Sequence, residues 1–534
     1  MCASIQINRF LTRIILINEV ILVMKKTLII LIFLSVSFIS RFIFAEIVTL
    51  DDGRIINLNK DGTFTIISED TPNSNNDIRR SIISFLNLMG VEYESIDFIN
   101  DSNIILKNIS AESQDINEEV KASIEKLEIN NLNKNYFKDL NINSFNTYKG
   151  KIFDKIMITN LSVIDNTDYY SIGELEIDKF DLKEVTLLKD FNFENIFKLI
   201  DSLSINKFIA KEIEIESLDP IESYYFSSLR INDIRNSNIG GLIYTDYRVE
   251  DDDGIFVADI FEVEDLKLNN KNLYKIDWEK PFENPIEVLF FIDSVKKISC
   301  KGCYSKDYKE NIIVEVAKFE FSDFKMENVS NYRIPVSMNI NFEGFTLDSI
   351  SAESKKIKEE ILTSLNYNQL KFDFKINLDW NTLYNIFSFD LNLGMQDGLD
   401  LNLSAKFEDV YKELVDFNFN EDSINALMED PKIKNLEISI QDNSLTDRLL
   451  EYGALNFHMT KREYVDFIIS EIQSDVVIKD SLQNDFIIAI TNFIQQPDKI
   501  TFSARPSTSL SYKDIINFIP NPTLLVKLLN IKIK

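Results

Sequence analysis

The stretch F-E-F-S-D-F-K-M, residues 319–326, contains the pattern that decides the fold. Apolar residues alternate with polar ones at Phe319 and Phe321, the alternation slips by one residue, and it resumes at Phe324 and Met326. Alternation is typical of a β-strand with one buried face, and a one-residue slip exchanges the faces, so each slip predicts a β-bulge, a bend or a crossing between sheets. The other copies between residues 95 and 350 are Leu127/Ile129/Leu132, Ile156/Ile158/Leu161/Val163, Leu175/Ile177/Phe180/Leu182, Leu203/Ile205/Phe208, Leu229/Ile231/Ile234, Phe261/Val263/Leu266/Leu268 and Ile340/Phe342/Phe345/Leu347.

The irregular spacing of these copies argues against a strict solenoid repeat, so we expect one long, curved, antiparallel sheet. Residues 351–365 break the pattern, because Ile357, Ile361 and Leu365 share one helical face. Beyond them we expect strands over 372–380, 387–393, 399–407, 433–440, 499–504 and 531–533, and helices over 445–450, 464–469, 482–494, 514–518 and 523–529. The expected fold class is therefore mainly β (α+β), with a few helices that are mostly C-terminal.

The N-terminal segment has the features of an export signal. Met24, Lys25 and Lys26 form a basic start, residues 27–40 are an apolar run, and Ala45 offers a small residue at the cleavage position before Glu46. The run is shorter than the roughly 20 residues of a membrane-spanning helix, which favours a cleaved signal peptide over 24–45. An uncleaved inner-membrane anchor is the alternative, and residues 1–23 are either an over-extended start or part of a longer membrane segment.

The rest of the chain divides by its composition. Two Asp-Gly turns separate three short β-prone runs within 46–67, which predicts a small β meander similar to a module that follows the signal in many exported bacterial proteins. A polar linker and a helix follow over 68–94. We then expect a repetitive antiparallel β region over 95–350 and an α+β domain over 351–534.

The formal net charge of −29 restricts the partners. A surface this negative repels phosphate backbones and anionic lipid headgroups, so we expect no nucleic acid partner, and membrane contact only through an uncleaved leader. Divalent cations or a basic patch on another protein fit the charge better, although solubility alone explains it. The expected location is the periplasm.

Cys300 and Cys303 form a C-x-x-C pair, whereas Cys2 leaves with the leader. A redox C-x-x-C opens a helix inside a βαβ unit, and nothing in the neighbouring sequence predicts that helix. In an oxidising compartment we expect a structural disulfide that closes a hairpin turn, with thiol–disulfide exchange as the alternative.

Metal and cofactor chemistry finds little support in the sequence. The acidic run before Gly254 contains Asp251, Asp252 and Asp253 but lacks the spaced oxygens of a calcium loop, so we interpret it as a hairpin turn, with loose cation binding as the alternative. His458 is the single histidine, which excludes two-histidine zinc sites, and we expect it to be structural. We expect no cofactor and no catalytic residue, although 86 acidic residues leave a carboxylate-based hydrolase open.

Two resemblances bear on function. The phase-slipping strands of 95–350 resemble those of AsmA-like envelope proteins, whose long sheets are thought to handle lipid. The C-terminal part is similar to an exported alphaproteobacterial family without an assigned activity, through Leu365-Asn-Tyr-Asn-Gln-Leu370, Leu445-Thr-Asp-Arg-Leu449, Phe493-Ile-Gln-Gln-Pro497 and Ser503-Ala-Arg-Pro506. Asparagine stands at 366 where that family has glycine.

The sequence therefore favours an exported, non-enzymatic envelope protein that binds lipid or an envelope protein. The alternating phenylalanines suit a buried core, and they also suit a groove for acyl chains. A structural or adhesive module and a carboxylate-based hydrolase are the alternative functions.

Overall fold

A computed structural model describes the protein. It describes residues 46–49, 55–58 and 64–68, four residues between 79 and 86, and most of 91–534; the parts of this last range left out are 116–117, 134–147, 166, 186–202, 219–220, 236–237, 252–253, 270–291, 308–311, 330–331, 348–361, 368, 411–430, 476–480 and 519–521. The chain divides into two compact units, one ending at Ile292 and one extending from Asp293 to Lys534. The expected signal peptide with Ala45, and most of the helix expected over 351–365, lie outside the described residues.

Residues 46–68 contain the three-stranded meander expected from the two Asp-Gly turns. Strands β1 (Glu46–Thr49), β2 (Ile55–Leu58) and β3 (Phe64–Ser68) pair antiparallel in this order. Asp-Gly pairs lie between successive strands in the sequence, and they tolerate the positive φ of tight hairpin turns.

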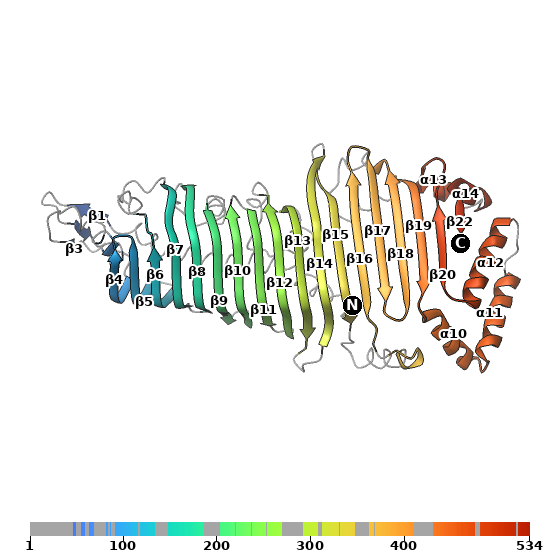
Figure 1. Ribbon diagram of the computed structural model, residues 1–534, viewed down its shortest axis with the longest axis horizontal. Coiled ribbons are helices and arrows are strands. Elements are labelled where there is room, and N and C mark those ends of the chain that lie inside the picture. The colour runs from blue at the N-terminus through green and yellow to red at the C-terminus, as the bar shows by residue number, and fades with distance from the viewer. Residues whose placement is uncertain are drawn as a thin grey trace. The chain divides into compact units, whose positions relative to one another are not determined.

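Long antiparallel strands make up the first unit, and each pairs with the next in sequence order (Figure 1, blue to green). They are β4 (Val91–Asn100), β5 (Asn103–Asp115), β6 (Glu118–Asn130), β7 (Tyr148–Ile164), β8 (Asp168–Val185), β9 (Leu203–Leu218), β10 (Ile221–Arg235), β11 (Asn238–Asp251) and β12 (Gly254–Leu268).

In the second unit, strands β13 to β19 also pair in sequence order, β19 pairs with β20 and β21, and β20 pairs with β22. The strands are β13 (Ile292–Lys306), β14 (Ile312–Val329), β15 (Tyr332–Leu347), β16 (Phe372–Asn381), β17 (Ile386–Met395), β18 (Leu399–Glu408), β19 (Lys432–Asp442), β20 (Lys499–Ala504), β21 (Leu510–Ser511) and β22 (Ile531–Ile533). The helices are α10 (Leu445–Asn456), α11 (Lys461–Asp475), α12 (Ser481–Gln495), α13 (Tyr512–Phe518) and α14 (Pro522–Leu529). The fold is thus mainly β with mostly C-terminal helices, as the sequence predicts.

The phase slips lie at residues in the left-handed conformation, and at Asp323 and Gly344 the pairing register also shifts, as in a β-bulge. In the quoted stretch, Asp323 has a φ of 53° and lies between the buried residues Phe321 and Phe324. Seven of the eight slips coincide with such a residue, and the full set in β5 to β15, with φ from 47° to 64°, is Asn108, Asn131, Asn160, Lys179, Glu212, Asp233, Asp246, Asp265, Gly302, Asp323 and Gly344. Asparagine, aspartate and glycine dominate because they adopt this conformation at the lowest cost among the amino acids.

In the first unit these residues lie in two rows that cross the sheet on alternate strands. The strand registers align Asn108 (β5), Asn160 (β7), Glu212 (β9) and Asp246 (β11) in the first row, and Asn131 (end of β6), Lys179 (β8), Asp233 (β10) and Asp265 (β12) in the second row. On neighbouring strands the alternation of buried and outward residues shifts at residues that face each other. The strands therefore stay paired one to one across the first row. This alignment explains the eighth slip, in β9: Asn206 is not left-handed, but it faces Lys179 and Asp233 of the second row.

The apolar side chains of this sheet are buried. Phe226, Tyr247, Phe256 and Phe261 are each at most 1% exposed, and the rings of Phe226 and Tyr247 stack with their centroids 4.8 Å apart. Burial of such side chains is the main favourable term in folding. These described apolar side chains of the first unit are therefore core, and they do not line an open apolar groove.

Candidate functional site

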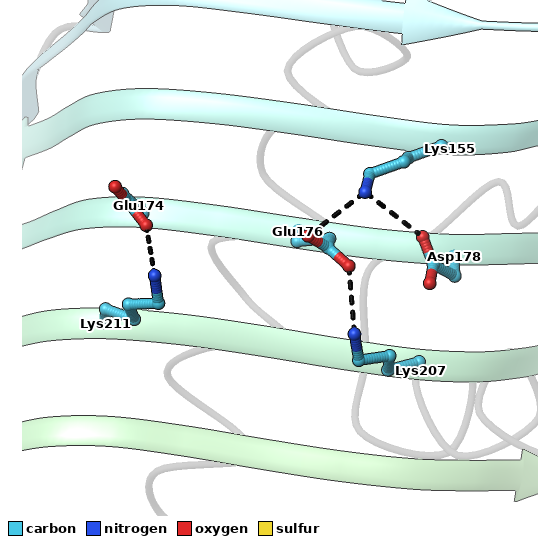
Figure 2. Close-up of polar contacts among 6 residues, drawn as sticks. All are labelled: Lys155, Glu174, Glu176, Asp178, Lys207 and Lys211. Carbon is cyan, nitrogen blue, oxygen red and sulfur yellow. Dashed lines mark hydrogen bonds and ion pairs between the residues drawn. The ribbon is translucent and has the colours of Figure 1, made fainter.

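Cross-strand ion pairs cover the outward face of the first unit between the two rows (Figure 2). The Glu174 carboxylate of β8 lies 2.5 Å from Lys211 Nζ of β9. The Glu176 carboxylate lies 3.1 Å from both Lys155 Nζ of β7 and Lys207 Nζ of β9. Exposed ion pairs stabilise a fold by at most about 1 kcal/mol each, so this ion-pair ladder mainly fixes strand register and keeps the face soluble.

The carboxyl groups of the ladder and of other described sites do not resemble catalytic acids. Burial by itself would raise the pKa of Glu176, but hydrogen bonds from Lys207 and Lys155 hold that pKa below its ordinary value. The other described carboxyl groups with a shifted pKa are also lowered, namely Asp154, Glu408, Glu463 and Asp514. A glycosidase acid needs a raised pKa, so none of these groups supports the hydrolase hypothesis.

At the level of the first row the same face is hollowed into a shallow groove of about 720 Å³, lined from β5 to β10. Its floor holds four serines that face one another on consecutive strands, Ser110, Ser123, Ser162 and Ser171. The hydroxyl oxygens of Ser123 and Ser162 are 2.7 Å apart. Small side chains at these positions leave the hollow open.

The left-handed asparagines fix the first row through their side chains. The Asn108 amide donates a hydrogen bond to the Glu94 carboxylate, and the Asn160 amide donates one to the Glu125 carboxylate. Gly173 stands opposite Glu212, where a Cβ atom would lie 2.4 Å from the Glu212 carboxylate in its present rotamer. The strand pattern of the sequence does not predict this groove, although Asn-Ile-Ser at 108–110 and Asn-Leu-Ser at 160–162 both contribute an asparagine and a serine to it.

The C-x-x-C pair forms a disulfide, but the predicted hairpin turn is wrong. Cys300 and Cys303 are bonded to each other inside β13, with their Cα atoms 6.3 Å apart and both side chains fully buried. They flank the left-handed Gly302, at the two positions that apolar residues occupy around every other left-handed residue of the set. The left-handed conformation turns both side chains to the same face, and this geometry brings them within disulfide range.

Two other predicted sites are described only in part. Asp251 ends β11 and pairs with Gly254 at the start of β12, which agrees with a hairpin, whereas Asp252 and Asp253 lie outside the described residues. At the expected cleavage site, Glu46 begins β1 and Ala45 is not described. Among the residues that the structure covers, His, Cys, Asp and Glu side chains form no group of three or more that could hold a metal ion.

The helical hairpin α10–α11 exposes apolar side chains at its tip. Leu455 is 71% and Phe457 is 55% exposed, and the Phe457 ring lies within 6.0 Å of the rings of Tyr464 and Phe467. His458 has a left-handed φ of 56°, and its backbone N–H donates to the Leu455 carbonyl, so it ends helix α10. We call Leu455, Phe457, Tyr464 and Phe467 the apolar tip.

Arg448 joins the C-terminal motifs that the sequence analysis quoted. Its guanidinium carbon lies 4.1 Å from the centre of the Tyr367 ring, and its Nη1 donates to the Leu365 carbonyl at 2.9 Å and to the Asn366 carbonyl. Asn366 has a left-handed φ of 55°, which explains why glycine is an equivalent residue there. With these partners satisfied, Arg448 is a structural residue.

Within the described ranges, no helix combines the length and the apolar character that crossing a bilayer requires. A family model whose description is "Uncharacterized protein" matches residues 392–534. A search of curated proteins gave no match. The C-terminal part of the chain, which contains Arg448 and the apolar tip, is therefore similar to a family without an assigned activity.

Proposed function

We propose that the protein is exported to the periplasm, with cleavage between Ala45 and Glu46, and that it binds an envelope protein there without catalysis. The basic start and apolar run of residues 24–45 support export. The buried Cys300–Cys303 disulfide supports an oxidising compartment.

The observation that carries the binding proposal is the exposure of the apolar tip. The buried rings of the first unit show that this chain can sequester its aromatic side chains, yet Leu455 and Phe457 remain more than half exposed. Large exposed apolar clusters mark interaction sites more often than isolated exposed residues do. The partner is expected to offer a complementary apolar cleft.

Lipid binding, which the sequence suggests as the alternative to binding an envelope protein, has less support. The alternating aromatic residues that suggested an acyl groove are buried in the first unit, with Phe256 and Phe261 at 0% exposure. We retain the relation to AsmA-like proteins as a proposal that rests on the slip pattern. Membership of the C-terminal part in the exported alphaproteobacterial family is also a proposal, supported by the glycine-like conformation of Asn366.

Site-specific photo-crosslinking in the native cells tests the binding proposal. A photo-reactive residue at Phe457 should capture one envelope protein, and Leu455→Asp should abolish that product. The same residue at Tyr384, a more exposed aromatic position in the turn after β16 at 70% exposure, is the control and should not capture the protein. Identical products at both positions, or lipid as the sole product at Phe457, would refute the proposal.

Export is tested separately by sequencing the N-terminus of the mature protein. A chain that begins at Glu46 and is recovered from the periplasm supports the proposal. A chain that retains residues 24–45 overturns the cleavage site.

A further inference from the structure

The shallow groove of the first unit differs in composition from the ion-pair ladder beside it. Half of its lining residues are serine, asparagine or tyrosine, and the rest are four isoleucines and leucines, three glutamates and one glycine, whereas the ladder consists of lysine, glutamate and aspartate. Tyrosine, serine, asparagine and glycine are the residues that dominate adaptable binding surfaces, because tyrosine offers a rigid amphipathic ring and the others offer hydrogen bonds at low entropic cost. The groove therefore has the character of a binding surface.

The arrangement of the groove specifies a ligand with regularly spaced hydroxyl groups. Ser110, Ser123, Ser162 and Ser171 form a line across consecutive strands, which are about 4.8 Å apart. That spacing is close to the length of one sugar ring in an extended oligosaccharide. Tyr225 stands at the β10 end of this line, beyond Glu214, and it is 42% exposed, so its ring is available to stack on a sugar face.

The charge of the groove restricts the chemical class of the ligand further. The groove is lined by three carboxylates, Glu125, Glu212 and Glu214, and by no lysine or arginine. In the ladder, Glu174 and Glu176 are matched by lysines, but Glu212 and Glu214 form no ion pair with any residue that the structure describes. Such a lining repels a phosphorylated or uronic-acid glycan and attracts an ammonium group.

We propose that this groove binds an extended saccharide that carries free amino groups. The serine hydroxyls and asparagine amides hydrogen-bond the sugar hydroxyls, Tyr225 stacks on a ring, and Glu212 and Glu214 accept hydrogen bonds from the ammonium group. This site goes beyond the proposed function, because it lies on the outward face of the first unit and shares no residue with the apolar tip.

Binding of three matched probes to the full-length protein tests the proposal by calorimetry at mildly acidic pH, where sugar amines are protonated. The probes are a glucosamine tetramer, its N-acetylated counterpart and tetralysine. The glucosamine tetramer should bind most tightly, because it alone combines ring faces, hydroxyl groups and positive charge. Equal or tighter binding of tetralysine would reduce the groove to a non-specific acidic surface, and absence of any binding would also overturn the proposal.

Variants assign the binding to the groove. Tyr225→Ala should weaken binding of both saccharides about fivefold, since it removes the stacking face. The double variant Glu212→Gln with Glu214→Gln should weaken the glucosamine tetramer about tenfold and leave the N-acetylated tetramer unchanged. Asp466→Asn with Glu471→Gln on α11, a double change of the same net charge at exposed positions outside the groove, is the control and should have no effect. An equal loss of affinity in this control variant would show that binding does not occur in the groove.

Discussion

The sheet of the first unit and the α10–α11 hairpin use aromatic side chains in opposite ways. Phe226 in β10 is 1% exposed and stacks on Tyr247, whereas Phe457 at the apolar tip is 55% exposed. In the sheet, the slip pattern turns most large apolar residues toward the core, so these residues specify the fold. In the hairpin, the same residue types stay exposed to solvent, and the proposed binding of a partner rests on this difference.

Removal of one ring from each region tests this contrast with the largest expected effect. Phe226→Ala should lower the free energy of unfolding of the first unit by about 3–5 kcal/mol, because it leaves a cavity in a packed core. Phe457→Ala should change stability by no more than about 0.5 kcal/mol, as is usual for exposed residues. Urea unfolding followed by circular dichroism measures both. A large loss for Phe457→Ala would identify the apolar tip as core and remove the basis of the binding proposal.

The disulfide in β13 spans one phase slip, and its removal should have the next largest effect. The double variant Cys300→Ala with Cys303→Ala should destabilise the second unit by about 2 kcal/mol on the chain-entropy estimate for so short a loop. The native protein without reductant should show no labelling by a thiol reagent, since both side chains are fully buried and bonded. Quantitative labelling of the native protein would contradict the disulfide.

Arg448 stabilises the second unit through noncovalent contacts. Arg448→Lys should cost about 1–2 kcal/mol, because an ammonium group has no planar face to stack on Tyr367 while it donates to the Leu365 and Asn366 carbonyls. Asn366→Gly should be nearly neutral, since glycine adopts the same left-handed φ. Urea unfolding of the two variants side by side provides the measurement, and a neutral Arg448→Lys would show that the contacts do not contribute.

The slip pattern predicted the strands because alternation and its interruption are local properties of a sequence. Phe321, Asp323 and Phe324 alone indicate a bulge, and the C-terminal elements followed equally from local periodicity and from prolines. The two rows and the groove were not predictable in this way. Ser123 and Ser162 meet only because β6 and β7 pair in one register across a connection of 17 residues from 131 to 147, and nothing local encodes that register.

A pair of facing aspartates tests whether the left-handed conformation determines which residue types occupy the rows. Asp246 is left-handed, whereas Asp259, which faces it from β12, is not. Asp246→Val should destabilise the first unit by about 1–2 kcal/mol, because a β-branched side chain is strained at positive φ. Asp259→Val is the matched control and should be nearly neutral, since valine suits an extended strand. Equal effects at the two positions would mean that the left-handed conformation does not determine residue choice in the rows.

The smallest expected effect is on the pH dependence of stability. It compares Glu176 in the sheet with Glu463 in the helical hairpin, and the pKa of each of these glutamates is lowered. At Glu176 burial opposes the shift, and hydrogen bonds from Lys207 and Lys155 produce it. At Glu463 the backbone N–H and then the hydroxyl of Thr460 produce it, as in a helix capping box. A carboxyl group whose folded pKa lies below its unfolded value stabilises the fold above that unfolded value, and this stabilisation disappears as the pH falls through the folded pKa.

Replacing either glutamate by glutamine should therefore flatten the loss of stability below about pH 4.5, the ordinary value for this side chain. Glu176→Gln should do so in the first unit, at a cost of less than about 1 kcal/mol at neutral pH, and Glu463→Gln should do so in the second unit. Urea midpoints over a pH series, with hydrogen exchange assigning each change to β8 or α11, measure the two effects. If Glu176→Gln left the acid dependence of β8 unchanged, the ion-pair ladder would contribute to solubility alone and not to strand register.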